Sequence, residues 1–184
     1  MTAQTEIPSL ASVEALPYLD DSGKILEAPF QGKVGVYAIF DRDRTLKFIG
    51  YSRDIYLSLK QHLMRQPQQC YWIKCQTIAR PSRTILENIK DAWIAENGTT
   101  PVGNEAEEEK WTQPIDIKPL MTEAERTAYE NAAGEELAQI KLLKKAARRV
   151  EADILVELES RGVQMELRFN PKLKETGLLD LKSS

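Results

Sequence analysis

The chain has 184 residues, 42% of them hydrophobic, which is enough to bury a core as one domain with an appendage or as two small domains. This composition excludes disorder throughout. No apolar run approaches the roughly 20 residues that span a bilayer, and no N-terminal segment pairs positive charge with an apolar stretch, so the sequence predicts a cytoplasmic protein without a transmembrane segment.

The net charge of −3 argues against a generally basic nucleic-acid binder, but the charge is unevenly divided. Positions 33–90 hold eleven Lys or Arg and four Asp or Glu, a local charge of +7, so the remainder carries −10. A local positive field attracts a polyanion such as DNA or RNA, although the same charges can simply solvate the surface of a small domain.

Residues 1–32 predict an extended N-terminal arm, because Pro17 and Pro29 discourage a long helix. The next segments alternate in type. Positions 34–40 and 46–51 are apolar and rich in β-branched and aromatic residues, which predicts a hairpin turning at 41–44. A helical period follows from Ile55 to Pro67.

Positions 71–78 predict a third strand, and Ser82 and Gly98 are suited to begin and end a second helix. Residues 33–104 therefore predict one compact α/β (α+β) domain.

Residues 105–121 are acidic and contain two prolines, which predicts a linker with a solvated loop at 105–110. Apolar residues then recur at three and four positions from 122 to 161, indicating one long amphipathic helix or two that meet near Gly134. Alternation at 163–169 predicts a short C-terminal β element within residues 122–184.

Five cations gather within positions 141–149 of that long helix. They can lie along a phosphate backbone or an anionic membrane, or form an ordinary amphipathic helix paired with neighbouring acids, and the last reading is favoured. The apolar stripe must pack on the α/β domain or on a second copy, so a protein partner or homodimer through 122–161 is a further expectation.

Cys70 and Cys75 are the only cysteines, and the chain has one histidine. A tetrahedral zinc site needs four ligands, so a metal site at these cysteines is not expected. Their strand-like spacing also disfavours a disulfide, and reduced thiols are the better interpretation.

Two tripeptides stand about a dozen positions apart: Gly35-Val36-Tyr37 and Phe48-Ile49-Gly50. Together with the later landmarks His62, Glu87 and Asn104, they resemble the paired signature of the GIY-YIG nuclease superfamily over about 70 residues. The wider pattern is similar to uncharacterised proteins of photosynthetic organisms, including cyanobacteria. The resemblance implies a small three-stranded sheet with flanking helices.

The resemblance also implies roles for single residues. Tyr37 would take or relay the proton of an attacking water, and His62 would assist it. Glu87 would hold Mg²⁺ or Mn²⁺ beside a phosphate. Gly35, Gly50 and Asn104 would be structural.

Two positions depart from the family pattern. Phe48 stands where a second tyrosine is expected and lacks its hydroxyl, and Ser58 stands where an arginine is expected. Arg53, Lys60 and Arg65 are the nearby cations that can still contact nucleic acid, but none starts at the same backbone position.

The favoured hypothesis is a protein that binds nucleic acid or a protein complex through a degenerate nuclease site. One alternative is an active Mg²⁺-dependent endonuclease that borrows another arginine. The other is an assembly or scaffold protein that docks through its long helix.

Overall fold

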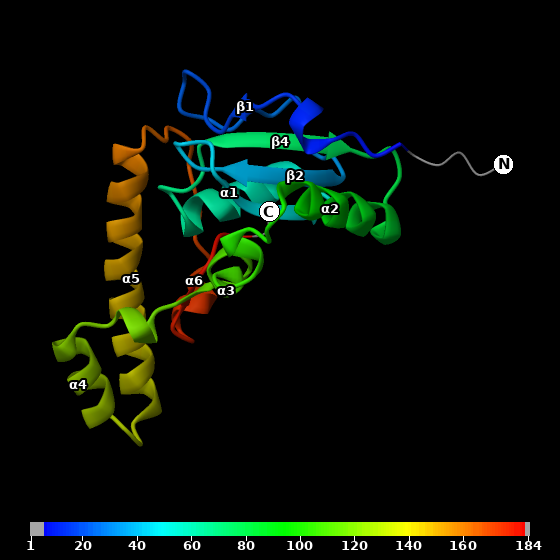
Figure 1. Cartoon of the computed structure of the whole chain (residues 1–184). Helices are drawn as coiled ribbons and strands as arrows, with labels where there is room; N and C mark the ends of the chain where they lie inside the picture. The colour runs from blue at the N-terminus through cyan, green and yellow to red at the C-terminus, as the bar shows by residue number, and fades with distance from the viewer. Residues whose placement is uncertain (1–5, 183–184) are drawn as a thin grey trace. The chain divides into compact units, whose positions relative to one another are not determined.

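The structure is a computed structural model that describes residues 6–182. The fold is α+β, with a four-stranded antiparallel sheet and several helices, one of them long (Figure 1). The chain divides into two compact units, Met1–Thr112 and Gln113–Ser184. None of the helices within residues 6–182 combines the length and apolar character that a bilayer crossing requires.

The first unit is built on the sheet, whose strands follow the order β1-β4-β2-β3 with every neighbouring pair antiparallel. The predicted hairpin and third strand are confirmed. The fourth strand comes from the N-terminal arm, which pairs along β4 instead of only packing on the domain. The strands are β1 (Leu16–Pro17), β2 (Gly35–Phe40), β3 (Leu46–Ser52) and β4 (Trp72–Thr77).

Two helices flank this sheet; both begin where predicted, the second also ends where predicted, and the first ends two residues before Pro67. Helix α1 (Ile55–Arg65) begins after Asp54, whose carboxylate accepts a hydrogen bond from the Leu57 N–H. Helix α2 (Arg83–Asn97) begins after Ser82, whose hydroxyl accepts from the Ile85 N–H. It ends at Gly98, which adopts a left-handed φ of 84°.

The alternation of β2 places the two helices against opposite faces of the sheet. Val36 and Ala38 lie in the core that contains Leu86, Ile89 and Trp93 of α2. The side chain of Tyr37 points to the other face, where it contacts His62 of α1.

The acidic segment 105–110 is largely exposed, as its charge predicts, but it forms a turn and the start of a helix where a loop was expected. A 3₁₀ turn (Val102–Asn104) leads into the short helix α3 (Glu108–Thr112). Trp111 of α3 is fully buried, because it stacks on the ring of Phe48 with centroids 5.3 Å apart. One buried tryptophan therefore attaches this segment to the first unit.

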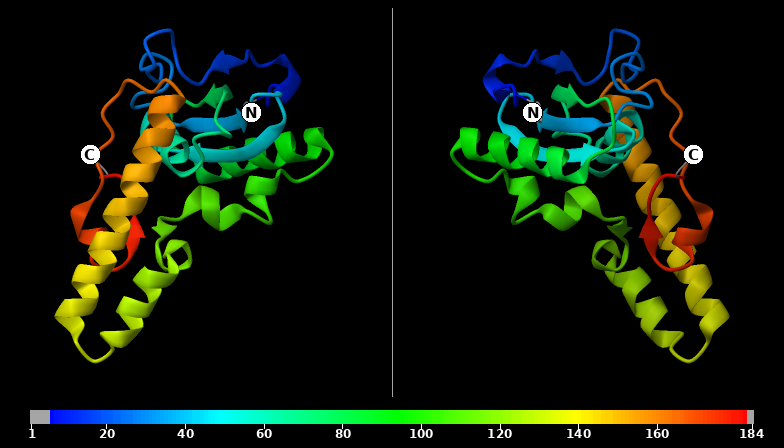
Figure 2. Two further views of the ribbon diagram at one scale, coloured as in Figure 1. Left: turned by 90° about the vertical axis from the view of Figure 1, so that its left-hand side faces the viewer. Right: turned by 90° about the vertical axis from the view of Figure 1, so that its right-hand side faces the viewer.

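The second unit is a helical hairpin with a small β element. Helices α4 (Glu123–Asn131) and α5 (Glu136–Ser160) lie side by side and meet at Gly134, as one of the two predicted arrangements requires (Figure 2). Gly134 takes a left-handed φ of 88° in the connecting turn. Thr122 and Glu125 form a capping box that starts α4.

The β element lies later than the alternation at 163–169 predicts. Strand β5 (Ile115–Asp116) pairs with β6 (Leu178–Leu179), and helix α6 (Pro171–Lys174) precedes β6. Phe169 makes only an isolated bridge to Leu181, and positions 163–168 are not strand. Alternation alone does not form a strand when no neighbouring strand supplies hydrogen bonds. Two further 3₁₀ turns cover Leu10–Ser12 and Lys118–Leu120.

Candidate functional site

Tyr37 and His62 meet inside the first unit. The Tyr37 hydroxyl lies 2.7 Å from His62 Nε2, and both side chains are buried. The rings of Phe48 and Trp111 cover this pair, with centroids 4.8 Å and 5.7 Å from the imidazole. The Phe48 ring thus lies in an aromatic cluster, where it contributes packing without the hydroxyl of a tyrosine.

Burial also determines how these two groups ionise. Desolvation raises the pKa of Tyr37, although a hydrogen bond with Ser58 opposes the shift. Desolvation, helped by the nearby Arg65 charge, lowers the pKa of His62 to about 3. At neutral pH the pair is uncharged and shielded from water, which suits a structural role more than proton transfer to a bound ligand.

Ser58 occupies the position where the nuclease pattern has arginine. Its hydroxyl donates to the Ser52 hydroxyl at 2.7 Å, and Ser52 in turn donates to the Asp54 carbonyl at 2.8 Å. Ser58 therefore connects the start of α1 with the end of β3. Arg65 turns into the same unit, where its Nη1 donates to the Trp111 carbonyl at 2.9 Å.

Glu87 lies against the other face of the sheet. The register pairs Tyr37 with Gly50 and Val36 with Tyr51, so Tyr51 shares the face of Val36, which packs towards α2. The Tyr51 hydroxyl donates to Glu87 Oε1 at 3.3 Å. Tyr37 and Glu87, which the resemblance joins in one catalytic group, are thus on opposite sides of the β2–β3 pair.

A hollow of about 420 Å³ opens next to Tyr51 and Arg83, whose side chains both donate to Glu87. Residues from the end of β3 and from the start of α2 line it: Tyr51, Ser52, Arg53, Pro81, Ser82, Arg83 and Leu86. Two arginines and the N-terminal end of a 15-residue helix therefore converge on one opening. Both features favour a negatively charged ligand.

Positive charges outnumber negative charges around this hollow. Arg83 Nε donates to Glu87 Oε1 at 2.9 Å, and this hydrogen bond is the main reason why the pKa of Glu87 is lowered. Arg53 is exposed, and Lys90 Nζ lies 5.9 Å from the centroid of the Tyr51 ring. Arg83 and Lys90 both act on the Glu87 carboxylate, and Arg53 lines the hollow, so the cations outnumber the carboxylate and the local field is positive.

Lys60 does not join them, because its ammonium lies over the ring of Tyr56, 5.6 Å from the centroid. Of the three cations expected to contact nucleic acid, the structure brings only Arg53 to the hollow, since Arg65 turns inward.

The three residues expected to be structural make close contacts. A Cβ on Gly50 would meet Phe48 Cε1 at 2.6 Å and the Tyr37 hydroxyl at 2.8 Å, and one on Gly35 would meet the Gln76 carbonyl. The Asn104 side chain accepts from the Ile49 N–H at 2.8 Å and donates to the Ile49 carbonyl at 2.7 Å. Asn104 thereby occupies the outer edge of β3 as a further strand would.

A divalent cation finds few protein ligands at Glu87. Within residues 6–182, no three His, Cys, Asp or Glu side chains gather as a metal site would require. One half-exposed carboxylate does not fit a resident metal on its own. Mg²⁺ can nevertheless be held by one carboxylate when the remaining ligands are phosphate oxygens and water.

The two cysteines, Cys70 and Cys75, lie inside the first unit. The Cys70 thiol is buried and donates to the His62 carbonyl at 3.6 Å. Cys75 lies on β4, where desolvation raises the pKa of its thiol to about 11. Neither environment stabilises a thiolate at neutral pH.

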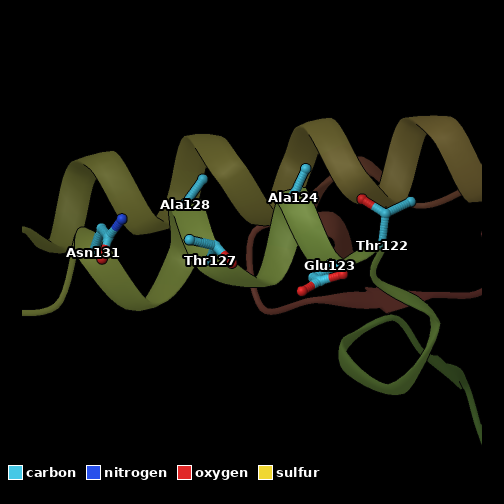
Figure 3. A pocket seen from close by; sticks show the side chains of 6 residues that line it. All are labelled: Thr122, Glu123, Ala124, Thr127, Ala128 and Asn131. Atoms are coloured by element: carbon cyan, nitrogen blue, oxygen red, sulfur yellow. The ribbon is translucent and has the colours of Figure 1, made fainter.

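A second hollow, of about 730 Å³, lies along α4 (Figure 3). Its side chains are short and come from α4 and its N-cap: Thr122, Glu123, Ala124, Thr127, Ala128 and Asn131. A single carboxylate supplies its only formal charge, and the surface is open. The first hollow, with two arginines and a helix N-terminus, is therefore the better candidate for binding a charged ligand.

Tyr51 and Arg83 are the site residues that the motif did not identify. Arg83 precedes Glu87 by four positions on a helix, which is the spacing of an ion pair. Tyr51 directly follows the glycine of the second tripeptide, so strand alternation alone places it on the face opposite Phe48.

Comparison with known proteins finds a relative that matches part of the chain. No family model matches the chain. Over 104 residues the chain is 32% identical to the "Bifunctional monothiol glutaredoxin-S16, chloroplastic" of Arabidopsis thaliana. The match covers 54% of this chain and 33% of the relative, so the chain spans about a third of that protein.

This finding corrects the family resemblance drawn from the two tripeptides. The relative carries the name of a monothiol glutaredoxin and not that of a GIY-YIG nuclease, and no family model supports the nuclease assignment. The expected functions built on that resemblance are corrected with it: a degenerate nuclease that binds nucleic acid or a protein complex, an active endonuclease, and a scaffold.

Proposed function

We propose that the chain is a module that binds a ligand bearing a phosphate-class anion, and that it accompanies redox chemistry without performing the thiol step. The observation that carries the proposal is the convergence of Arg53, Arg83 and the α2 N-terminus on one hollow. The link to redox chemistry rests on the name of the Arabidopsis relative. That name also describes the relative as bifunctional.

The thiols support a function other than thiol exchange. The attacking species in such chemistry is the thiolate, and a thiol with a pKa of about 11 is almost entirely protonated at neutral pH. Cys70 is buried and donates to a backbone carbonyl. We therefore assign this chain a function that needs no reactive cysteine.

The groups around the hollow suit an oxyanion. Arginine presents a planar fork of N–H donors that fits phosphate oxygens, and a helix N-terminus adds backbone N–H groups and a partial positive charge. Arg53 is exposed and Arg83 is held near the opening by Glu87. Leu86 and the Tyr51 ring supply an apolar floor for the organic part of a ligand.

Magnesium enters this proposal only together with the ligand. Glu87 would supply one carboxylate oxygen, and the phosphate and water would supply the rest. Tyr37 and His62 are assigned to holding the packing between sheet and helix. A DNA or RNA strand, a nucleotide and a small phosphate all carry the phosphate group that this site would recognise.

The test is a binding titration of the full chain with three probes: inorganic pyrophosphate, ATP and a short labelled single-stranded oligonucleotide, each with and without Mg²⁺. The double variant Arg53→Ala, Arg83→Ala should weaken every probe that binds by tenfold or more, since each lost charge-assisted contact is worth about 1.5–3 kcal/mol. The probe bound most tightly identifies the ligand source.

The matched control removes two cations elsewhere, with Lys141→Ala and Lys145→Ala. It lowers the net charge equally and should leave pyrophosphate binding unchanged. Failure of all three probes to bind the wild-type chain, or an equal loss in both double variants, would refute the proposed site.

Thiol redox chemistry is the second candidate, and the relative's name is the observation that favours it. A thiol-specific chromogenic reagent distinguishes the two. The native chain should react at least a hundredfold more slowly than the chain unfolded in urea, and a Cys75→Ala variant should keep full pyrophosphate binding. Rapid reaction of one cysteine in the native chain would favour the thiol function.

A further inference from the structure

The longest helix has one face whose side chains are exposed among residues 6–182. On α5 the buried residues Leu143, Ala146, Ala147, Val150 and Leu158 form the packed side. The opposite side carries exposed residues that recur at three or four positions, the spacing of one helix face. This α5 outer face comprises Leu137, Lys141, Lys145, Arg148, Ala152, Leu155 and Val156.

The cations on this face differ from the other cations of α5. Lys144 pairs with Glu175 at 3.0 Å, and Arg149 pairs with Glu125 at 2.8 Å, so both belong to contacts within the second unit. Among residues 6–182, no such partner is recorded for Lys141, Lys145 or Arg148. Glu159 lies at the end of the same face and is exposed, so the face carries a net charge of +2 when all four residues are counted.

The apolar residues on this face are unusually open. Leu137 and Val156 are exposed to 77% and 66%, the two largest values among the exposed large apolar side chains of the described residues, and Leu155 is exposed to 44%. They stand at the two ends of the face with the cations between them. Nineteen positions separate Leu137 from Val156, a length of about 29 Å on a straight helix.

We propose that the α5 outer face docks on an anionic lipid surface. A flat bilayer can meet the whole length of a straight helix, with anionic headgroups facing the cations and the interfacial region receiving the apolar ends. A nucleic-acid backbone satisfies the cations equally but offers nothing to Leu137 and Val156, so the lipid surface is the better complement. The proposal concerns the second unit and does not depend on the phosphate-class site.

The expected attachment is reversible. Each Lys or Arg near an anionic surface contributes about 1 kcal/mol at physiological ionic strength, and the contribution falls within a Debye length of about 8 Å. Three such residues give roughly a hundredfold preference for anionic over neutral vesicles. That preference should fall when salt is raised.

The experiment is co-sedimentation of the full chain with vesicles of phosphatidylcholine alone and of phosphatidylcholine mixed with phosphatidylglycerol. The wild-type chain should bind only the anionic vesicles, and the triple variant Lys141→Gln, Lys145→Gln, Arg148→Gln should lose at least tenfold in affinity. A second variant, Leu137→Ser with Val156→Ser, should also weaken binding while it keeps the charge.

The control variant neutralises three exposed cations of the first unit: Lys24→Gln, Arg42→Gln and Arg80→Gln. It has the same net charge as the triple variant and should bind anionic vesicles as the wild type does. The proposal is overturned if the wild type ignores anionic vesicles or if the control loses as much affinity as the triple variant. The proposal is also overturned if the serine variant binds anionic vesicles as the wild type does while the triple variant loses binding of a single-stranded oligonucleotide. In that case the face would recognise a nucleic-acid strand.

Discussion

His62 is a titratable residue whose burial makes the stability of the fold depend on pH. Its folded pKa of about 3 lies below the ordinary value of 6.5, so below pH 6.5 the unfolded chain takes up a proton that the folded chain refuses. Stability from this residue is complete above pH 6.5 and is lost as the pH falls towards 3, at up to about 1.4 kcal/mol per pH unit.

The variant His62→Gln should therefore have a flatter dependence on pH. Urea unfolding of both proteins between pH 7.5 and 4 measures it, and carboxylates such as Glu125 contribute equally to both curves. The variant should be less stable than the wild type at pH 7.5 because it disturbs the contact with Tyr37, and the gap should narrow as the pH falls. Parallel curves would show that His62 is not neutral and buried as described.

Asn104 gives a second prediction at the scale of one residue. Its amide satisfies both the N–H and the carbonyl of Ile49 at the edge of the sheet. Asn104→Ala should cost about 2 kcal/mol of unfolding free energy, because two partly buried backbone groups lose their partner.

The comparison is Asn97→Ala, which removes an exposed hydrogen bond to Thr99 and should cost less than about 1 kcal/mol. Chemical unfolding at neutral pH measures both variants. An equal loss would mean that Asn104 does not stabilise the edge of β3.

At the scale of helices and strands, Arg149 joins α4 to α5. Its guanidinium donates to Glu125 and to the Leu120 carbonyl at 2.9 Å, and it also meets Asp153 on its own helix. Because the side chain is about a third exposed, Arg149→Met should cost only about 1 kcal/mol.

The loss should be concentrated in α4, whose amides should exchange with deuterium faster than those of α2. The variant Arg148→Met, at an exposed neighbouring position, is the matched control and should leave exchange unchanged. Uniform acceleration over the whole chain would instead indicate a general loss of stability.

Much of the first unit is predictable from its sequence because its signals are local. Alternation marks β2 and β3, and the capping residues Ser82 and Gly98 mark the ends of α2. The burial of Trp111 depends on the Phe48 ring, more than sixty positions away. The acidic residues before Trp111 in the sequence predict exposure and carry no sign of that contact. Positions 163–168 alternate but have no neighbouring strand, a fact that only the folded chain contains.

The site was less predictable than the fold. The sequence order of Tyr37, His62 and Glu87 suggested one catalytic group, whereas the pleat of β2 and β3 puts Tyr37 and Glu87 on opposite faces. Strand alternation within the two tripeptides puts Tyr37 and Phe48 on one face of the sheet. It puts Tyr51, which contacts Glu87, on the other face. The name of the relative was not accessible from any residue pattern, since neither cysteine lies in an exposed setting that indicates redox chemistry.

On the scale of the whole molecule, the division of charge corresponds to two proposed contacts. The +7 of positions 33–90 includes the arginines at the hollow, and the acidic remainder contains the cationic α5 outer face. The phosphate-class site lies in one compact unit and the lipid-docking face in the other. The two contacts share no residue, so variants in one unit should leave the other contact intact.

The most direct measurement is an NMR titration of the isotopically labelled full chain with inorganic pyrophosphate at low ionic strength. We expect the shifted amides to belong to Ser52, Arg53, Ser82, Arg83 and Glu87, while those of Cys75 and the α5 outer face stay unchanged. Shifts centred on Cys75 or on α5, or no shift at millimolar pyrophosphate, would contradict this expectation.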